Sequence, residues 1–164
     1  MRIEAKELQY SALNDAVRSS KDRSVEIFGC IGQRYLGAGL SDKDIVVHGT
    51  PGNALGAYLS GGSITVDGNV QEATGDTMNG GTIEVHGRAG DATGYAMRGG
   101  KILIEGDVGY RCGIHMKAYR TQRPVIVIGG RAGSFLGEYQ AGGLIVALGE
   151  SEGPIVGNFC GTGM

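Results

Sequence analysis

Apolar residues recur along the chain in two columns, each at a fixed distance before a glycine. The first column, four residues before the glycine, consists of Val25, Ile45, Ile64, Ile83, Ile102, Val125 and Ile145. The second column, two residues before it, consists of Ile27, Val47, Val66, Val85, Ile104, Val127 and Ala147. Because side chains two positions apart share one face of a β-strand, the columns predict one buried strand face, repeated seven times.

Glycines set the length of the repeat, with a spacing of 19 residues in each of two ladders. The first ladder is Gly37, Gly56, Gly75, Gly94 and Gly113, and the second is Gly49, Gly68, Gly87 and Gly106. Glycines fixed at corners predict a positive φ or a close backbone approach, so these nine are the expected structural turn residues. The returns between strands, ~13 residues long, are too short for a crossover helix. The pattern therefore predicts an all-β parallel β-helix, a solenoid of about 19 residues per turn and about seven turns.

A further column of long apolar side chains follows the same spacing. It contains Met78, Met97 and Met116, with Leu40 and Leu59 at the equivalent earlier positions. A methionine row resembles a copper-binding or partner-recognition surface, but at the spacing of the repeat it favours core packing.

Two departures from the spacing predict loops that project from the solenoid. One turn gains four residues around Lys117–Pro124, a basic segment, and the last turn gains five around Gly149–Pro154, an acidic one. Insertions in solenoids project from one face and often contact partners. The residues expected to make partner contacts are Lys117, Tyr119, Arg120 and Arg123.

The two ends of the chain differ from the repeat. Residues 1–23 predict an N-terminal helical cap, with Ser11 as N-cap and Leu13 and Val17 on one face, that covers the first rung of the solenoid at 24–164. Residues 161–164 reproduce the start of a repeat and then stop. Two interpretations follow: the chain is truncated at its C-terminal end, or a neighbour covers that end, including a second copy in a homo-oligomer.

Composition narrows the function classes. The chain has 164 residues, a formal net charge of −2 and 41% hydrophobic residues, which argues against nucleic acid or an anionic membrane as partner. It lacks an apolar run of the ~20 residues needed to span a bilayer and a signal peptide at its start, so a cytoplasmic protein is expected. Cys30, Cys112 and Cys160 lie in no CxxC pair and are expected to be inert thiols.

One outward column carries candidate chemistry. His48, Asp67, His86 and Glu105 each precede a second-ladder glycine and should form a ladder on four successive rungs, as divalent-metal ligands could. The same column also fits a solvated polar face. A neighbouring outward column, expected to contain Val46, Leu103, Ile126 and Val146, indicates that part of this face is covered. Since nucleophile, P-loop and zinc motifs are missing, no catalytic, cofactor-binding or metal-binding residue is predicted.

The repeat unit resembles a known family. Units of the form Gly-x-x-Met-x-Gly-Gly-x-Ile-x-Val-x-Gly look like the GXGXG domain, the right-handed β-helix of the glutamate synthase large subunit, and the resemblance covers residues 24–164. Longer runs are similar to the stand-alone, archaeal-type version. These runs are Gly32–Leu40, Gly49–Asn53, Gly87–Gly100 and Val108–Lys117. The repeat is also similar to the subunit of formylmethanofuran dehydrogenase that carries the same glycine repeat.

The resemblance implies a role without catalysis. In that family, a glutamine amidotransferase releases ammonia, a synthase with FMN and an iron–sulfur cluster converts 2-oxoglutarate to glutamate, and the β-helix braces the two. The resemblance thus implies a docking subunit for nitrogen assimilation, with FMN and the cluster in partner subunits. Family members also continue beyond the point where this chain stops. The formylmethanofuran dehydrogenase subunit is the alternative, and an autonomous β-helix enzyme is the second alternative.

Overall fold

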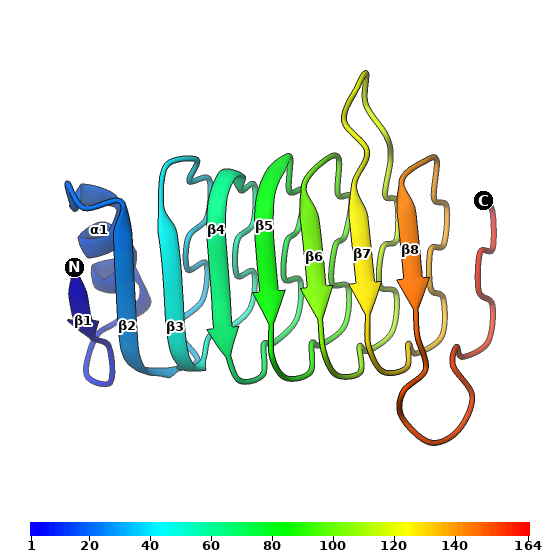
Figure 1. The fold of residues 1–164 in the computed structure, drawn as a ribbon, viewed down its shortest axis with the longest axis horizontal. Helices are drawn as coiled ribbons and strands as arrows, with labels where there is room; N and C mark the ends of the chain where they lie inside the picture. The colour runs from blue at the N-terminus through cyan, green and yellow to red at the C-terminus, as the bar shows by residue number, and fades with distance from the viewer.

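The structure, a computed structural model that describes residues 1–164, winds the chain into a coil of parallel strands (Figure 1). Its elements are β1 (Arg2–Glu4), α1 (Tyr10–Ser19), β2 (Ser24–Ile31), β3 (Asp44–Thr50), β4 (Ser60–Asp67), β5 (Gly80–Val85), β6 (Lys101–Ile104), β7 (Val125–Ile128) and β8 (Leu144–Ala147). All eight strands form one sheet in sequence order. In Figure 1 the strands descend in front and the returns ascend behind as the chain advances, so the coil is right-handed. The predicted parallel β-helix is confirmed.

Identical apolar positions stack from rung to rung along the inside of the sheet. The strand register pairs Ile45 with Ile64, Ile64 with Ile83, and Ile83 with Ile102. These side chains are at most 1% exposed. Since a fully buried isoleucine contributes about 1.5–3 kcal/mol, the ladders supply much of the driving force for folding. The column of Leu40, Leu59, Met78, Met97 and Met116 is buried too, which confirms its role in the core.

Strand β7 corrects the predicted pattern by one residue. Ile126 and Ile128 pair with Ile102 and Ile104 and are fully buried, whereas Val125 and Val127 point outward. The sequence pattern predicts Gly129 as the ladder glycine. The ladder position belongs instead to Gly130, whose N–H donates to the Gly106 carbonyl at 3.1 Å. The insertion before β7 is therefore five residues long, and a strand that is apolar on both faces hid the shift.

The first-ladder glycines make room for the core. In each return, residues at alternate positions have positive φ, as at Ala73 (57°), Gly75 (70°) and Thr77 (51°). A Cβ at Gly75 would lie 2.5 Å from Ile102 Cδ1. The equivalent contacts are Gly37 with Ile64, Gly56 with Ile83, Gly94 with Ile126 and Gly113 with Ile145. The glycine spacing is thus coupled directly to the isoleucine column that it packs against.

The second-ladder glycines serve a close approach between rungs. A Cβ at Gly87 would lie 2.6 Å from the Gly68 carbonyl oxygen, and one at Gly106 would lie 2.8 Å from that of Gly87. Gly49 and Gly68 also have positive φ, at 127° and 149°. A side chain here would push apart turns that are hydrogen-bonded to one another.

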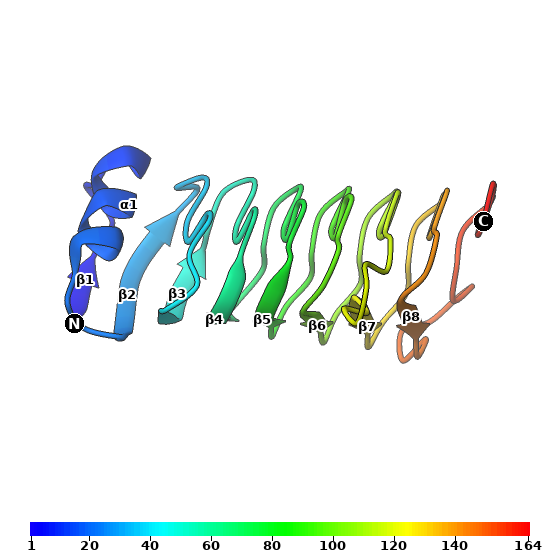
Figure 2. The same ribbon diagram turned by 90° about the horizontal axis from the view of Figure 1, so that it is seen from above.

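The N-terminal cap contains a strand as well as the predicted helix. Strand β1 joins the sheet beside β2, with Ile3 opposite Ile27 (Figure 2). Leu13 and Val17 of α1 are fully buried, as predicted, but Ser11 is not the N-cap. The helix begins at Tyr10 after Gln9, which makes no capping side-chain bond.

Two buried polar side chains fasten the cap to the first turns. Lys43 Nζ donates to the carbonyls of Ser20 (2.7 Å) and Asp22 (3.0 Å), at the C-terminal end of the helix where cations are favoured. Gln33 Nε2 donates to the carbonyls of Ala5 and Leu8. These contacts anchor the cap, so the solenoid does not begin on an exposed strand edge.

Candidate partner interface

The outer face of the sheet divides into two halves of different chemistry. We call the outward side chains of β2–β5 the polar half and those of β6–β8 the apolar half. The middle outward column reads Glu26, Val46, Thr65, Glu84, Leu103, Val127 and Val146 from first rung to last. The change falls between β5 and β6, while the inward columns continue unchanged.

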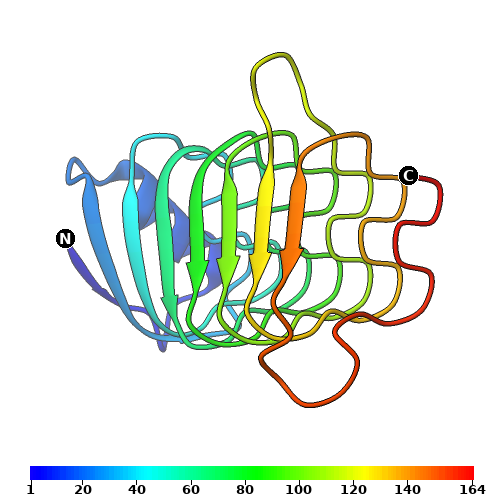
Figure 3. The ribbon, with the colours of Figure 1, turned by 45° about the vertical axis from the view of Figure 1, so that its right-hand side comes forward.

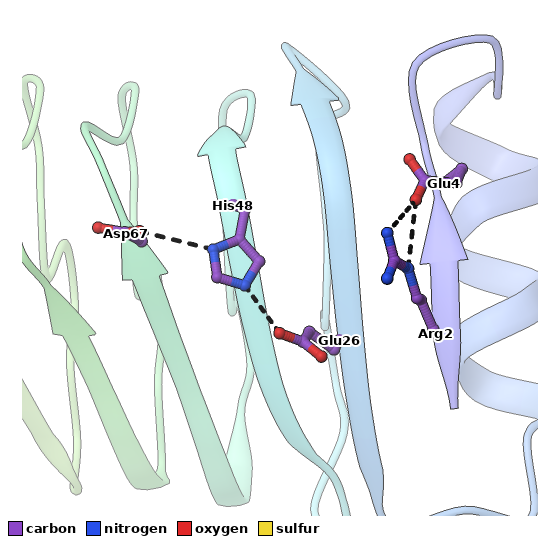
Figure 4. A network of polar contacts seen from close by, with 5 residues as sticks. All are labelled: Arg2, Glu4, Glu26, His48 and Asp67. Carbon is purple, nitrogen blue, oxygen red and sulfur yellow. Dashed lines mark hydrogen bonds and ion pairs between the residues drawn. The ribbon is translucent and has the colours of Figure 1, made fainter.

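The polar half holds each of two histidines between carboxylates. His48 Nε2 lies 2.9 Å from Glu26 Oε1, and its Nδ1 lies 3.5 Å from Asp67 (Figure 4). The hydrogen bond with Glu26 raises the pKa of His48, although partial desolvation acts against it. His86 lies 3.0 Å from Glu105 and 3.5 Å from Glu84. Both ring nitrogens of each histidine therefore already face a carboxylate.

Metal and cofactor donors do not gather anywhere in the chain. The structure brings His48, Asp67, His86 and Glu105 onto one face, as expected, but splits them into two trios, and no group of three or more His, Cys, Asp or Glu residues is arranged to hold a metal ion. The three cysteines are free. Burial raises the pKa of the Cys30 thiol to about 11 and that of Cys112 to about 12. Protonated thiols on separate turns do not fit an iron–sulfur cluster, which needs grouped thiolates.

The apolar half exposes aliphatic side chains in a hollowed surface. Leu144 and Leu148 are 54% and 53% exposed, and Leu103, Val127 and Val146 are half-buried beside them. An open depression of about 520 Å³ lies among Leu103, Val127 and Leu148, with Glu84, Glu105 and Glu150 at its edge. Gly129 contributes to this hollow because it stands where the two preceding rungs carry Glu105 and His86.

A basic hairpin borders the apolar half at the N-terminal ends of its strands. Residues 117–124 rise beside β7, in yellow in Figure 3. Two backbone hydrogen bonds between Tyr119 and Gln122 close the hairpin, and Arg120 at its tip stacks on the Tyr119 ring at 5.1 Å. Lys117, Tyr119, Arg120 and Arg123, the predicted contact residues, are all exposed.

An acidic loop borders the opposite edge. Residues 149–154 extend from the C-terminal end of β8 and carry Glu150 and Glu152, both exposed (Figure 3). Asp107 holds the base of this loop by accepting bonds from the Arg131 N–H (2.8 Å) and the Ser151 hydroxyl (2.7 Å). The Arg131 N–H and the Ser151 hydroxyl lower the pKa of the Asp107 carboxyl. The two insertions thus bracket one surface from opposite sides.

A second set of exposed aromatic rings lies on the return side of the coil. His115 stacks on Tyr139 with ring centroids 5.2 Å apart, and Phe135 stacks on Phe159 at 5.1 Å. These rings contact their counterparts on the adjacent turn, whereas the aliphatic side chains of the apolar half have their outward surfaces uncovered. The apolar half between the two loops is therefore the better candidate interface.

The sequence pattern located this surface only in part. It identified both loops and an apolar outward column, but it assigned Ile126 to that column, where the structure places Val127. It missed Lys43 and Gln33, whose partners lie about 20 residues or more away in the sequence. The repeat spacing was the available signal for β7, since Gly130 and Gly149 are 19 residues apart.

Comparisons with known proteins agree with the fold. Residues 14–164 match the family described as GXGXG motif. The chain is 45% identical over 174 residues to the uncharacterized protein MJ1350 of Methanocaldococcus jannaschii, an alignment that covers 99% of this chain and 67% of that protein. No solved structure matches the chain. None of its helices has the length and apolar character required to cross a membrane.

Proposed function

Because the chain belongs to the GXGXG motif family, we propose that it is a non-catalytic docking subunit of a glutamate synthase complex. Its partners in this proposal are a glutamine amidotransferase subunit and a synthase subunit that carries FMN and an iron–sulfur cluster. The complex would transfer the amide nitrogen of glutamine to 2-oxoglutarate. The observation that carries the proposal is the family match over residues 14–164, together with the runs similar to the stand-alone version.

The structure supports a docking role through its rigidity and its exposed surface. The inward ladders and 101 backbone hydrogen bonds make a stiff rod, and a stiff rod can hold two enzymes at a fixed distance. The apolar half offers the aliphatic centre and charged rim typical of protein interfaces. The cysteines and histidines do not group as redox-cofactor ligands, so the proposal places FMN and the cluster in the partner subunits.

Purification of the tagged chain from its native source tests this proposal. We expect an amidotransferase and an FMN-containing iron–sulfur protein to co-purify, and glutamate formation from glutamine and 2-oxoglutarate to require the chain on reconstitution. Recovery of the chain with molybdenum or tungsten subunits would favour the formylmethanofuran dehydrogenase assembly instead. Recovery of the chain alone under mild conditions, with no effect on glutamate formation, would contradict the docking role.

A further inference from the structure

The apolar half is charged with opposite sign along its two edges. Lys101, Lys117, Arg120 and Arg123 lie at or beyond the N-terminal ends of β6 and β7, and Glu150 and Glu152 lie beyond the C-terminal end of β8. The seven ion pairs of the chain include none of these six groups. Between the edges, the four-residue strands leave an apolar strip ~13 Å wide.

We propose that this strip is the interface at which a second copy of the chain binds face to face. The partner of a surface with a basic edge, an apolar centre and an acidic edge must carry the same three zones in reverse order. A second copy, turned by a half rotation about the long axis of the solenoid, has that arrangement. The rotation keeps β7 over β7 but exchanges the upper and lower edges seen in Figure 1. Each basic hairpin then meets the acidic loop of the other copy.

Other arrangements of two copies fit this surface less well. A half rotation about the strand direction would bring the two basic hairpins together, and like charges at an interface are strongly unfavourable. Contact through the open last turn, near residues 155–164, would leave Leu144, Val127 and both charged loops uncovered. Since twisted sheets pack at about 30° to one another, a contact centred on β7 also moves the two polar halves out of register.

The pairing is independent of the proposed glutamate synthase role, because it needs only this chain. In the dimer, Leu103, Val127, Val146, Leu144 and Leu148 bury aliphatic surface, and the Gly129 hollow receives a side chain of the other copy. The charged edges set the orientation and speed the encounter, as electrostatic complementarity does in known interfaces.

Sedimentation velocity of the full chain over a wide concentration range tests the pairing. Wild-type protein should form dimers. One variant reverses the hairpin (Arg120→Glu with Arg123→Glu) and another reverses the loop (Glu150→Lys with Glu152→Lys). Each should weaken dimerisation by at least about tenfold, because each faces like with like. The chain that combines all four substitutions should regain the dimer, since its edges are complementary again.

Matched controls separate this result from effects of net charge or folding. Lys6→Glu with Lys21→Glu changes the net charge as the hairpin variant does, but in the N-terminal cap, and should leave the dimer intact. Circular dichroism should show the same thermal unfolding for all variants, since every substituted side chain is exposed. A monomeric wild type would overturn the pairing and leave the strip to a different partner. A dimer that both reversals leave unchanged would also overturn it, and would favour contact through the open end.

Discussion

The polar and apolar halves of the outer sheet face differ although their rungs are built alike. Both halves share the inward isoleucine column and the same glycine corners. In the polar half, charged residues pair with neighbours on adjacent strands, as His48 does with Glu26. In the apolar half, aliphatic residues and unpaired charged loops face outward. The repeat therefore determines the fold, and the outward positions, which the repeat leaves free, carry the function.

The largest expected effect tests whether the two halves share one core. Ile64→Ala and Ile126→Ala should each lower the free energy of unfolding by about 2–5 kcal/mol, because each leaves a cavity between stacked rungs. Val127→Ala should cost less than about 1 kcal/mol, since its side chain faces outward. Chemical denaturation measures all three. A larger loss for Val127→Ala than for Ile126→Ala would contradict the register of β7.

The next effect concerns the glycine corners in the two halves. Gly75→Ala and Gly113→Ala should each destabilise the fold by about 1–3 kcal/mol, because alanine is strained at φ near +70° and its Cβ would displace an isoleucine methyl group. Thermal unfolding measures the loss, with Ala73→Gly as a control at a non-glycine position of positive φ. If either corner tolerated alanine without loss, the coupling between glycine and isoleucine ladders would be wrong.

A smaller effect is expected at the edge of the apolar half. Asp107→Asn should lower stability at neutral pH by less than about 1 kcal/mol, because it weakens the bonds to the Arg131 N–H and the Ser151 hydroxyl on a partly exposed group. The folded-state pKa of Asp107 lies below its unfolded value, so its contribution is present above about pH 4 and is lost as pH falls through the folded pKa. Denaturation of wild type and variant should therefore converge at low pH. A constant difference at every pH would exclude this carboxylate as the cause.

The smallest effect belongs to the polar half. The folded-state pKa of His48 is raised, so its pairing stabilises the protein below about pH 6.5 and the contribution is lost as pH rises through the folded pKa. His48→Gln should remove a slight excess of stability at acidic pH and change nothing at alkaline pH. Glu26→Gln should act in the same direction, because Glu26 is the main cause of the shift. NMR titration of the His48 ring gives the pKa directly, and an unshifted value would contradict the pairing.

Most of the fold could be predicted because each rung repeats the same physical demands. Column spacing gave the strands, and glycine spacing gave the turns. The error at β7 arose where both faces of the strand are apolar, so alternation could not decide which valine or isoleucine points inward. Strand β1 was missed because three residues carry too little pattern, and its pairing depends on β2, more than 20 residues away.

The candidate interface was less predictable than the fold. Both loops followed from breaks in the spacing, but their positions on opposite edges of one surface depend on where each turn enters and leaves its strand. The glycine spacing alone predicts Gly129 as a corner residue. Its position opposite Glu105, where it opens the hollow, required the corrected register.

Hydroxyl-radical footprinting as a function of protein concentration tests most directly that the apolar half is the interaction surface. Tyr119, Leu144 and Leu148 are each more than half exposed in the single chain, as is Tyr58 on the return side. As concentration rises, oxidation of the first three side chains should fall together while that of Tyr58 stays constant. Unchanged oxidation of Tyr119 and Leu148, with protection appearing at Val46 in the polar half or at Phe159 in the last turn, would contradict the account.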